Sequence, residues 1–434
     1  MKMKVAVLGL GYVGLPLAVA IAKSNKYNLV GFDLNEKKIS DINNKICPID
    51  DKICAEELLN IDLPIDNNIS IISNSDIYIV CVPTPVLDDY SPDLTPLISA
   101  TNTVIASIIA DKLNNINSKH RYIIIESTIN PGVCDEVLIP MVESKTNLIA
   151  GKDFDIAHCP ERINPGDEKW SVYNIPRNIG STSPTATKYL ADFYRNVIDA
   201  DINELPDLKT TEATKIIENT FRDINIAFVN ELAKSFDVLG IDLLTVLKGA
   251  SNKPFAFMPH FPSCGVGGHC IPVDPYYLIE RAKQSGFDHK FLKLAREINN
   301  SMPAYTVNLL ANGLNENALA IKGTKIGLLG MSYKANVGDI RESPSIELKK
   351  ILIEKGANLE IFDPYFLDLS TKDNLENLLD SVDAILIATD HKEFKNIDSE
   401  LLIKHNIKVV IDGKNCLNKE EILSSGVYYK GIGR

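Results

Sequence analysis

A cysteine beside a glycine-rich run is the most informative chemical feature of the sequence. Cys270 follows the run Gly265-Val266-Gly267-Gly268-His269, and Asp274 lies four residues further on. Glycines lack a Cβ, so such a run lets a ligand approach the backbone closely. A thiol beside this loop, with a carboxylate nearby, can act as a covalent nucleophile. Most isolated cysteines are small buried hydrophobic residues, and this segment alone leaves that alternative open.

Three polar residues further upstream are spaced to share one face of a helix. Lys215, Asn219 and Arg222 fall at positions i, i+4 and i+7 of a segment rich in isoleucine. Buried charge is costly without a partner, so the stripe predicts a ligand surface. Lys215 and Asn219 would face a developing oxyanion, and Arg222 an anionic or sugar group. The alternative is a solvated face whose charges pair with Glu212 and Glu218.

The N-terminal segment carries a dinucleotide-binding signature. Gly9, Gly11 and Gly14 lie between a predicted strand and a predicted helix, and Asp33 follows Gly14 by 19 residues. The glycines permit a tight turn and close approach to a pyrophosphate at the helix N-terminus. Asp33 would accept hydrogen bonds from ribose hydroxyls and repel a 2′-phosphate, which favours NAD over NADP. A glycine-rich turn without a ligand is the alternative.

Polar, proline-rich turns follow three more of the predicted strands. They contain Thr84, Thr128 and Glu161. In an open parallel sheet, ligands bind at the carboxyl ends of the strands, so the threonines would reach the nicotinamide half and Glu161 the reacting centre. Each threonine could instead be a capping or turn hydroxyl. A redox cofactor together with a nucleophilic cysteine indicates oxidation through a thioester.

Short apolar segments alternate with amphipathic ones in two regions of the chain. This alternation predicts an α/β fold with two doubly wound, parallel, Rossmann-like sheets. The expected strands are Lys4–Leu8, Asn28–Phe32, Ile77–Val82, Tyr122–Glu126 and Asp155–His158 in the first region, and Lys325–Leu329, Asn358–Phe362, Ala384–Ala388 and Lys408–Ile411 in the second. The second region has only Gly327 and Gly330 of the glycine signature.

A helical stretch lies between the two α/β regions. The segment from Thr210 to Leu239 reads as one long helix that ends at Gly240. It is apolar on several faces, so we expect it to join two copies of the chain in a homodimer. An intrachain bridge between the flanking units is the alternative. The predicted domains are residues 1–203, 204–304 and 305–434.

Composition limits the partners of the protein. The formal net charge of the 434 residues is −12, which argues against nucleic acid or an anionic membrane as the main partner. The apolar stretches are strand-sized, and the N-terminus runs directly into a strand pattern, so we expect neither a membrane span nor a signal peptide. The eight cysteines are scattered, which is typical of reduced thiols and predicts a cytoplasmic protein.

One cluster of potential metal ligands occurs in the sequence. His260, Cys264, His269 and Cys270 lie close together in the sequence. Their spacing matches none of the paired cysteine or histidine patterns that bind zinc. We therefore expect no metal.

Together these segments resemble the UDP-glucose/GDP-mannose 6-dehydrogenase family over nearly the whole chain. The matching motifs are GLGYVG, VPTP, EST, CPERINPGD, EATKIIENTFRDINIAFVNELA, VGGHCIPVDPYYL and SYKANVGDIRES. The resemblance implies an NAD-binding domain, a central helical dimerisation region that contributes to catalysis, and a C-terminal domain that binds a UDP-sugar. It also implies oxidation of a sugar C6 alcohol to a carboxylate with two NAD⁺.

The resemblance assigns roles to individual residues. It makes Cys270 the nucleophile that forms a thiohemiacetal and a thioester, with Asp274 supporting it and the hydrolytic water. It makes Lys215 and Asn219 the pair that stabilises the oxyanion and transfers protons, and Glu161 the residue that activates water. These three residues also contact the substrate. The matching cofactor contacts are Gly9, Gly11, Tyr12, Val13, Gly14, Asp33, Lys38, Thr84, Arg341 and Thr128, the last also in the catalytic set. The other matching substrate contacts are Arg162, Ile163, Arg222, Gly267 and Lys334.

Within the family, the chain is most similar to the UDP-N-acetylhexosamine branch. The segments that carry this similarity are PERINPGD, ENTFRDINIAFVNE, NKPFAFMP and GGHCIPVDPYYL. One segment departs from the pattern of this branch, because Met258 to Gly265 stands where an FMPFYPGPG-like run is usual. His260 and Cys264 in this segment could alter the sugar specificity. The sequence leaves open whether the sugar is N-acetylglucosamine, N-acetylgalactosamine or N-acetylmannosamine.

Three alternative functions stay open. A UDP-glucose 6-dehydrogenase would have the same fold and chemistry. A two-electron dehydrogenase of small hydroxy acids would not need Cys270. A non-catalytic NAD-binding protein would need none of Cys270, Lys215, Asn219 and Asp274, so their presence argues against it.

Overall fold

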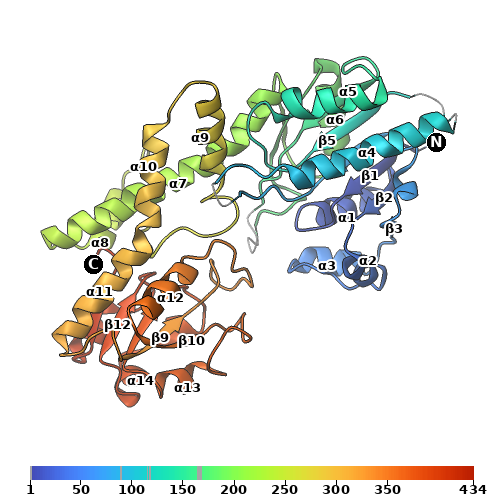
Figure 1. Ribbon diagram of the computed structural model, residues 1–434. Coiled ribbons are helices and arrows are strands. Elements are labelled where there is room, and N and C mark those ends of the chain that lie inside the picture. The colour runs from blue at the N-terminus through green and yellow to red at the C-terminus, as the bar shows by residue number, and fades with distance from the viewer. Residues whose placement is uncertain (1, 88–89, 115, 117–118, 164–168) are drawn as a thin grey trace. The chain divides into compact units, whose positions relative to one another are not determined.

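The structure, a computed structural model, describes residues 2–434 except 88–89, 115, 117–118 and 164–168. The chain divides into two units (Figure 1). Unit 1 comprises Met1–Glu218 and Tyr276–Gly286, and unit 2 comprises Asn219–Pro275 and Phe287–Arg434. The finer division into three domains stays a prediction.

Unit 1 contains a sheet in the order β3-β2-β1-β4-β5-β6-β7-β8. Its strands are β1 Lys4–Leu8, β2 Asn28–Phe32, β3 Ile65–Asp66, β4 Ile77–Val80, β5 Arg121–Ile125, β6 Phe154–His158, β7 Arg177–Ser181 and β8 Ile202–Glu204. The strands from β3 to β6 pair in parallel, β7 runs antiparallel to β6, and β8 runs parallel to β7. The carboxyl ends of β1, β4, β5 and β6 therefore meet at one edge.

Helices cover both faces of this sheet. Successive residues of a strand point to opposite faces, so Val5 and Val7 pack in one cluster while Ala6 and Leu8 pack in another. The first cluster contains α1 Gly14–Ser24, α3 Lys52–Leu58 and α6 Pro184–Arg195. The second contains α4 Thr95–Leu113 and α5 Ile139–Thr146, which lie side by side in Figure 1. The remaining elements of this unit are α2 Glu36–Asn43, η1 Ile69–Ile72 and η2 Cys134–Leu138.

Unit 2 contains a parallel sheet in the order β10-β9-β11-β12-β13. Its strands are β9 Lys325–Leu329, β10 Asn358–Phe362, β11 Ala384–Ile387, β12 Val409–Asp412 and β13 Tyr428–Gly431. Its helices are α8 Leu243–Ala250, α10 Lys290–Asn300, α11 Met302–Glu316, α12 Pro344–Glu354, α13 Leu375–Leu379, η3 Phe394–Asn396, α14 Ser399–Lys404 and α15 Lys419–Ser424. Buried residues of α11 and α12 cover one face, and those of α13 to α15 cover the other.

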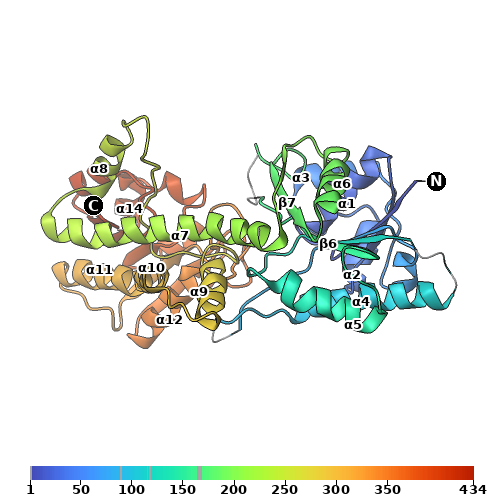
Figure 2. The ribbon, with the colours of Figure 1, turned by 90° about the horizontal axis from the view of Figure 1, so that it is seen from above.

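The long helix α7 spans Leu208–Leu239 and is conspicuous in Figure 2. It ends where Gly240 adopts a φ of +67°, a conformation that side chains with a Cβ disfavour. Its C-terminal part belongs to unit 2, where Arg296 of α10 pairs with Asp223 at 2.5 Å. The helix α9 spans Asp274–Gln284 and therefore begins four residues after Cys270.

The fold class expected from the sequence is confirmed. The long helix and the expected strands are present, with bounds that differ by two residues at most. Four short strands of the described structure, β3, β7, β8 and β13, were not predicted from the sequence, nor was the antiparallel pairing of β6 with β7. In the described part of the chain, no helix combines the length and the apolar character needed to cross a membrane.

Candidate active site

The turn between β1 and α1 has the geometry of a dinucleotide cradle. Gly9 has a φ of +90°, and a Cβ there would lie 2.6 Å from the carbonyl oxygen of Cys81. A Cβ on Gly14 would lie 1.9 Å from the carbonyl oxygen of Gly9. A Cβ on Gly11 would meet nothing within 4 Å, so this backbone is open to a ligand. The first residues of α1 receive no side-chain cap, which leaves its N-terminus suited to a pyrophosphate.

Asp33 is held firmly at the end of β2. Its carboxylate accepts hydrogen bonds from the amides of Leu10 and Asn35 at 2.8 and 2.9 Å and from Lys38 Nζ at 2.9 Å. Burial raises the pKa of Asp33, but these hydrogen bonds outweigh it and hold the pKa below its ordinary value. A carboxylate has about four acceptor sites, so Asp33 keeps capacity for a ribose hydroxyl. Tyr12 is exposed beside this turn, and Val13 is half-buried.

Hydrogen bonds connect the turn after β4 to the turn after β5. Thr84 Oγ1 donates to the carbonyl oxygen of Thr128 at 2.6 Å, and Ser127 Oγ donates to that of Val82 at 2.6 Å. Tyr277 of α9 also donates its hydroxyl to the Thr84 carbonyl. The structure therefore brings the two predicted threonines together and gives Thr84 the turn-stabilising hydrogen bond of the alternative interpretation. Their contact with a nicotinamide stays a prediction.

Glu212 of α7 is hydrogen-bonded to the backbone of the segment that follows Thr128. Its buried carboxylate accepts hydrogen bonds from the amides of Gly132 at 2.5 Å and Cys134 at 2.9 Å. Burial raises the pKa of Glu212 to about 7, although both amides act in the opposite direction. Glu218 pairs with Arg162, at 2.6 Å between Nη2 and Oε1. The alternative in which Glu212 and Glu218 pair with the polar stripe is therefore wrong.

Glu161 is buried at the end of β6. Its Oε1 accepts a hydrogen bond from the amide of Ile163. Burial raises the pKa of Glu161, while the positive charges of Arg177 and Lys215 oppose that rise. A carboxyl group with a raised pKa, beside two cations, has the properties of a general acid–base.

A buried ion pair lies near Glu161, and the sequence analysis missed it. Arg177 of β7 donates through Nη1 to both oxygens of Glu126, at 2.8 and 2.6 Å, and Tyr194 donates to Glu126 at 2.5 Å. All three side chains are fully or almost fully buried. The available signal was an arginine within a short segment that reads weakly as a strand, RNIGS.

The polar stripe of α7 separates into buried and exposed parts. Lys215 is 8% exposed and Asn219 is 7% exposed, whereas Arg222 is exposed. Asn219 Nδ2 donates to Asp274 Oδ2 at 2.6 Å. In the described residues of unit 1, the titratable groups near Lys215 include Glu161 and the buried His158, whose pKa is lowered by burial to about 4. Lys215 and Asn219 thus offer donors on one face of one helix.

The glycines before Cys270 are required by packing within unit 2. A Cβ on Gly267 would lie 2.7 Å from Tyr333 Cβ, and Gly268, with a φ of +91°, would place one 2.8 Å from the Tyr333 ring. The amide of Gly268 donates to the carbonyl oxygen of Arg341 at 3.0 Å. Close approach to a neighbouring segment thus explains these glycines, where the sequence suggested approach to a ligand. Cys270 itself is half-buried, and its carbonyl oxygen accepts from the Asp274 amide at 2.9 Å.

The segment that packs on these glycines contains two predicted ligand contacts. Lys334 is half-buried, and Arg341 is exposed with its guanidinium paired to Asp339 at 2.6 Å. These residues and Cys270 belong to the same unit.

The two unusual residues of the Met258–Gly265 segment differ in their surroundings. Cys264 is buried, its amide donates to the Gly413 carbonyl at 3.1 Å, and burial raises the pKa of its thiol. His260 is half-buried and lies edge-on to Phe221 at 6.2 Å between ring centroids. No group of three or more potential metal ligands gathers among the residues that the structure describes.

Comparison with known families covers almost all of the chain. The NAD-binding domain model of the UDP-glucose/GDP-mannose dehydrogenase family matches residues 3–198, its central domain model residues 209–301 and its UDP-binding domain model residues 327–419. The chain belongs to the UDP-glucose/GDP-mannose dehydrogenase family.

Individual members of the family are similar over their whole length. The chain is 35% identical to a UDP-N-acetyl-D-glucosamine 6-dehydrogenase of Pseudomonas aeruginosa, covering 93% of this chain and 94% of the relative. It is 36% identical to a UDP-N-acetyl-D-mannosamine dehydrogenase of Pyrococcus horikoshii, covering 100% and 99%. The solved structure of a UDP-D-ManNAc dehydrogenase from Pyrococcus horikoshii superposes with a TM-score of 0.91 at 34% identity, covering 100% and 99%.

The family match assigns NAD to unit 1, where the glycine turn and Asp33 lie. It places a UDP-binding domain in unit 2, which contains Lys334 and Arg341. The roles of individual residues stay predictions. Part of the predicted substrate motif, residues 164–167, lies outside the described residues.

Proposed function

We propose that this chain is an NAD-dependent UDP-N-acetylhexosamine 6-dehydrogenase. It oxidises the C6 hydroxymethyl group of the sugar to a carboxylate. The observation that carries this proposal is the full-length similarity to relatives named as UDP-N-acetyl-D-glucosamine and UDP-N-acetyl-D-mannosamine dehydrogenases. Cys270, Lys215, Asn219 and Asp274 supply groups suited to such a reaction.

The overall reaction consumes one alcohol, one water and two NAD⁺, and yields one carboxylate, two NADH and three protons. Bound NAD⁺ supplies the hydride acceptor for each oxidation. Gly9, Gly11, Gly14 and Asp33 would hold it, because the open backbone at Gly11 and the carboxylate of Asp33 suit its pyrophosphate and ribose.

Cys270 would divide the oxidation into two stages. Its thiolate sulfur attacks the C6 aldehyde carbon, and the carbonyl oxygen takes up a proton to give a thiohemiacetal. Oxidation of this adduct gives a thioester. A free thiol has a pKa of about 8.5, and the positive charge that we assign to Lys215 in this reaction would favour the thiolate.

Hydrolysis of the thioester would need a base and an oxyanion site. Glu161, as a carboxylate, removes a proton from water, whose oxygen attacks the thioester carbon. Lys215 and Asn219 donate to the resulting oxyanion, and collapse releases the sugar carboxylate and the Cys270 thiolate. The buried setting of Glu161, with its raised pKa, supports the acid–base role.

Substrate recognition would use the UDP-binding domain and α7. We assign Gly267 and Lys334 to the UDP-sugar, together with Ile163, Arg162 and Arg222. Arg162 is held at present by Glu218, so binding of a phosphate or sugar there would compete with that ion pair. Lys334 and Arg341 lie on the segment that contacts Gly268.

The active enzyme would be a cytoplasmic homodimer. Unit 2 exposes large apolar side chains along α7, including Phe228 at 54% and Val238 at 88%. Monomeric proteins expose few contiguous apolar surfaces of this kind, and two-fold dimers are the commonest assembly. The scattered cysteines support a reducing compartment.

The stoichiometry of NADH tests this function. With purified chain, two NADH formed per UDP-N-acetylhexosamine consumed would agree with the proposal. One would identify a two-electron dehydrogenase, and none a non-catalytic NAD-binding protein. A panel of UDP-N-acetylglucosamine, UDP-N-acetylgalactosamine, UDP-N-acetylmannosamine and UDP-glucose would select the sugar, and a preference for UDP-glucose would contradict the branch proposed.

A further inference from the structure

The carboxylate of Asp363 occupies in the second sheet the position that Asp33 occupies in the first. Each aspartate directly follows the strand that pairs with the first strand of its sheet. The amide of Gly330 donates to the Phe362 carbonyl at 2.9 Å, as that of Gly9 does to Phe32 at 2.9 Å. The amide of Met331 donates to Asp363 Oδ2 at 2.6 Å, as that of Leu10 does to Asp33 at 2.8 Å.

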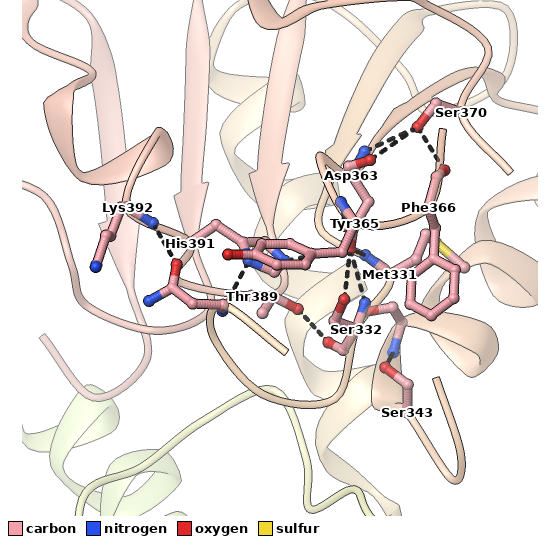
Figure 3. Close-up of polar contacts among 12 residues, drawn as sticks. Met331, Ser332, Ser343, Asp363, Tyr365, Phe366, Ser370, Thr389, His391 and Lys392 are labelled. Atoms are coloured by element: carbon pink, nitrogen blue, oxygen red, sulfur yellow. Dashed lines mark hydrogen bonds and ion pairs between the residues drawn. The ribbon is translucent and has the colours of Figure 1, made fainter. Parts of the chain in front are cut away.

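The two aspartates differ in what their carboxylates bind. Asp363 is 0% exposed and accepts from the Ser332 amide at 2.8 Å, from Ser332 Oγ at 3.0 Å and from the Tyr365 amide at 2.7 Å (Figure 3). His391 Nε2 lies 3.2 Å from Asp363 Oδ2. Four of the donors, counting the Met331 amide and His391, converge on Oδ2, and Oδ1 accepts from the Tyr365 amide. Because this carboxylate is completely buried among its donors, it is closed to a nucleotide hydroxyl.

His391 links this carboxylate to a neighbouring segment. Its Nδ1 lies 3.0 Å from the amide of Asn336, so Nδ1 must accept and Nε2 must carry the proton that Asp363 receives. The ring is 0% exposed and stacks on Tyr365 at 5.0 Å between centroids. Both ring nitrogens are thus used, and the ring has one orientation in which both bonds form.

The segment after β11 holds the segment after β9 at three points. Besides the His391 bond, Thr389 Oγ1 donates to the Ser332 carbonyl at 2.5 Å. The amide of Lys392 donates to Asn336 Oδ1 at 3.1 Å. Asn336 has a φ of +59°, a left-handed conformation that is unfavourable for most residues and that these bonds stabilise.

The segment held in this way leads to the predicted ligand contacts. The amide of Tyr333 donates to the Asp339 carbonyl at 2.9 Å, which closes a loop containing Lys334. Two residues further on, the Arg341 carbonyl accepts from the amide of Gly268, two residues before Cys270. The hydrogen bonds of His391 thus connect, through backbone hydrogen bonds within unit 2, to both the predicted substrate-binding segment and the nucleophile loop.

We propose that His391 is a positioning residue for UDP-sugar binding. Together with Asp363 it holds residues 332–341 in the shape that presents Lys334 to the nucleotide sugar and supports the Cys270 loop. The proposal rests on the function proposed above.

Substitution of His391 tests this role. His391→Phe keeps an aromatic ring beside Tyr365 but removes both hydrogen bonds. We expect the dissociation constant for UDP and the KM for the UDP-sugar each to rise at least about tenfold, while kcat falls less than about threefold. Misplaced binding groups weaken the ground state and the transition state equally, which raises KM without a matching loss of kcat. The affinity for NAD⁺, measured with the same full-length protein, should change less than the affinity for UDP, since the glycine turn and Asp33 lie in unit 1 and Arg341 alone of the predicted cofactor contacts lies within residues 332–341.

A conservative variant and a matched control separate positioning from general stability. His391→Gln retains a donor and an acceptor, so it should recover at least half of the lost UDP affinity. His405→Phe removes another histidine of unit 2, which is also buried but whose Nδ1 lies 2.6 Å from Asp380 Oδ1, outside residues 332–341. It should leave UDP affinity unchanged.

Asn336→Gly provides a second route if His391→Phe does not fold. Glycine tolerates the positive φ, so this variant removes only the acceptor for Lys392, and it should raise the KM for the UDP-sugar about threefold or more. A folded His391→Phe protein with wild-type UDP affinity would overturn the positioning role of His391. An Asn336→Gly protein with unchanged KM would overturn its premise, that the shape of residues 332–341 determines how the UDP-sugar binds. A wild-type protein that binds neither UDP nor UDP-sugar would instead contradict the proposed function.

Discussion

Asn219 Nδ2 donates a hydrogen bond of 2.6 Å to the carboxylate of Asp274, and both side chains are buried. A carboxylate only accepts, so this contact sets the orientation of the Asn219 amide and leaves its second N–H available. Asp274 begins α9 four residues after Cys270. The bond thus links the polar stripe of α7 to the helix that follows the nucleophile loop.

We expect Asn219→Ala to lower kcat by roughly a hundredfold or more, because it removes a donor to the developing oxyanion. Steady-state kinetics with the UDP-sugar would measure it. Asn225→Ala is the control, because Asn225 lies on the same helix and its side chain donates to the backbone carbonyl of Phe221. Equal kcat in the two variants would contradict the role of Asn219.

Cys270→Ser should retain some oxidation of the alcohol and then stall as a covalent ester or aldehyde, since a serine hydroxyl is the weaker nucleophile and its ester resists hydrolysis. Mass spectrometry of the protein after one turnover would detect the adduct. Cys264→Ala should keep most activity, because that thiol is buried with a raised pKa. Wild-type turnover in Cys270→Ala would refute the covalent role.

The wild-type protein should prefer NAD⁺ strongly over NADP⁺. Asp33→Ala should weaken NAD⁺ binding and relax that preference, because the carboxylate that repels a 2′-phosphate is gone. The ratio of kcat/KM for the two cofactors is the measurement. Asp62→Ala removes a fully exposed aspartate paired with Lys45 and should leave the ratio unchanged. Equal efficiency of the wild type with both cofactors would count against the role of Asp33.

Activity should decline on the acid side at a pH above the ordinary glutamate pKa of about 4.3, because burial raises the pKa of Glu161. The water-activating form is the carboxylate, which is lost as the pH falls through the raised pKa. A pH profile of kcat would show this acid limb. In Glu161→Gln the limb should disappear, kcat should fall, and thioester should accumulate. An unaltered limb in that variant would assign the titration to another group.

Sedimentation at micromolar concentration should show about twice the chain mass of 47.9 kDa. Phe228→Asp places a charge on the exposed apolar side of α7 and should favour the monomer. Leu423→Asp changes an exposed leucine of α15 and serves as the control, for which we expect no effect on assembly. A fully active wild-type monomer would contradict the dimer.

The local sequence patterns determined much of the fold. Residues Lys4–Leu8 and Lys325–Leu329 are short apolar segments next to glycines, and both are strands with the predicted bounds. The apolar spacing up to Gly240 likewise located the C-terminus of α7. Such elements were predictable because their signals, hydrophobic periodicity and turn residues, lie within a few positions of one another.

The tertiary structure decided the pairings between distant residues. Strand β7 was not predicted because it contains a buried charge, Arg177. That charge is compensated by Glu126, which lies 51 residues away in the sequence. Two other contacts could not be predicted from the sequence: the hydrogen bond from the Gly132 amide to Glu212, and the pairing of His391 with Asp363. In an extended chain, each of these side chains could satisfy its hydrogen bonds with many different partners. The sequence alone identified the reactive residue types and the family, whereas only the fold determined which partners hold them, because burial removes water as the competing partner.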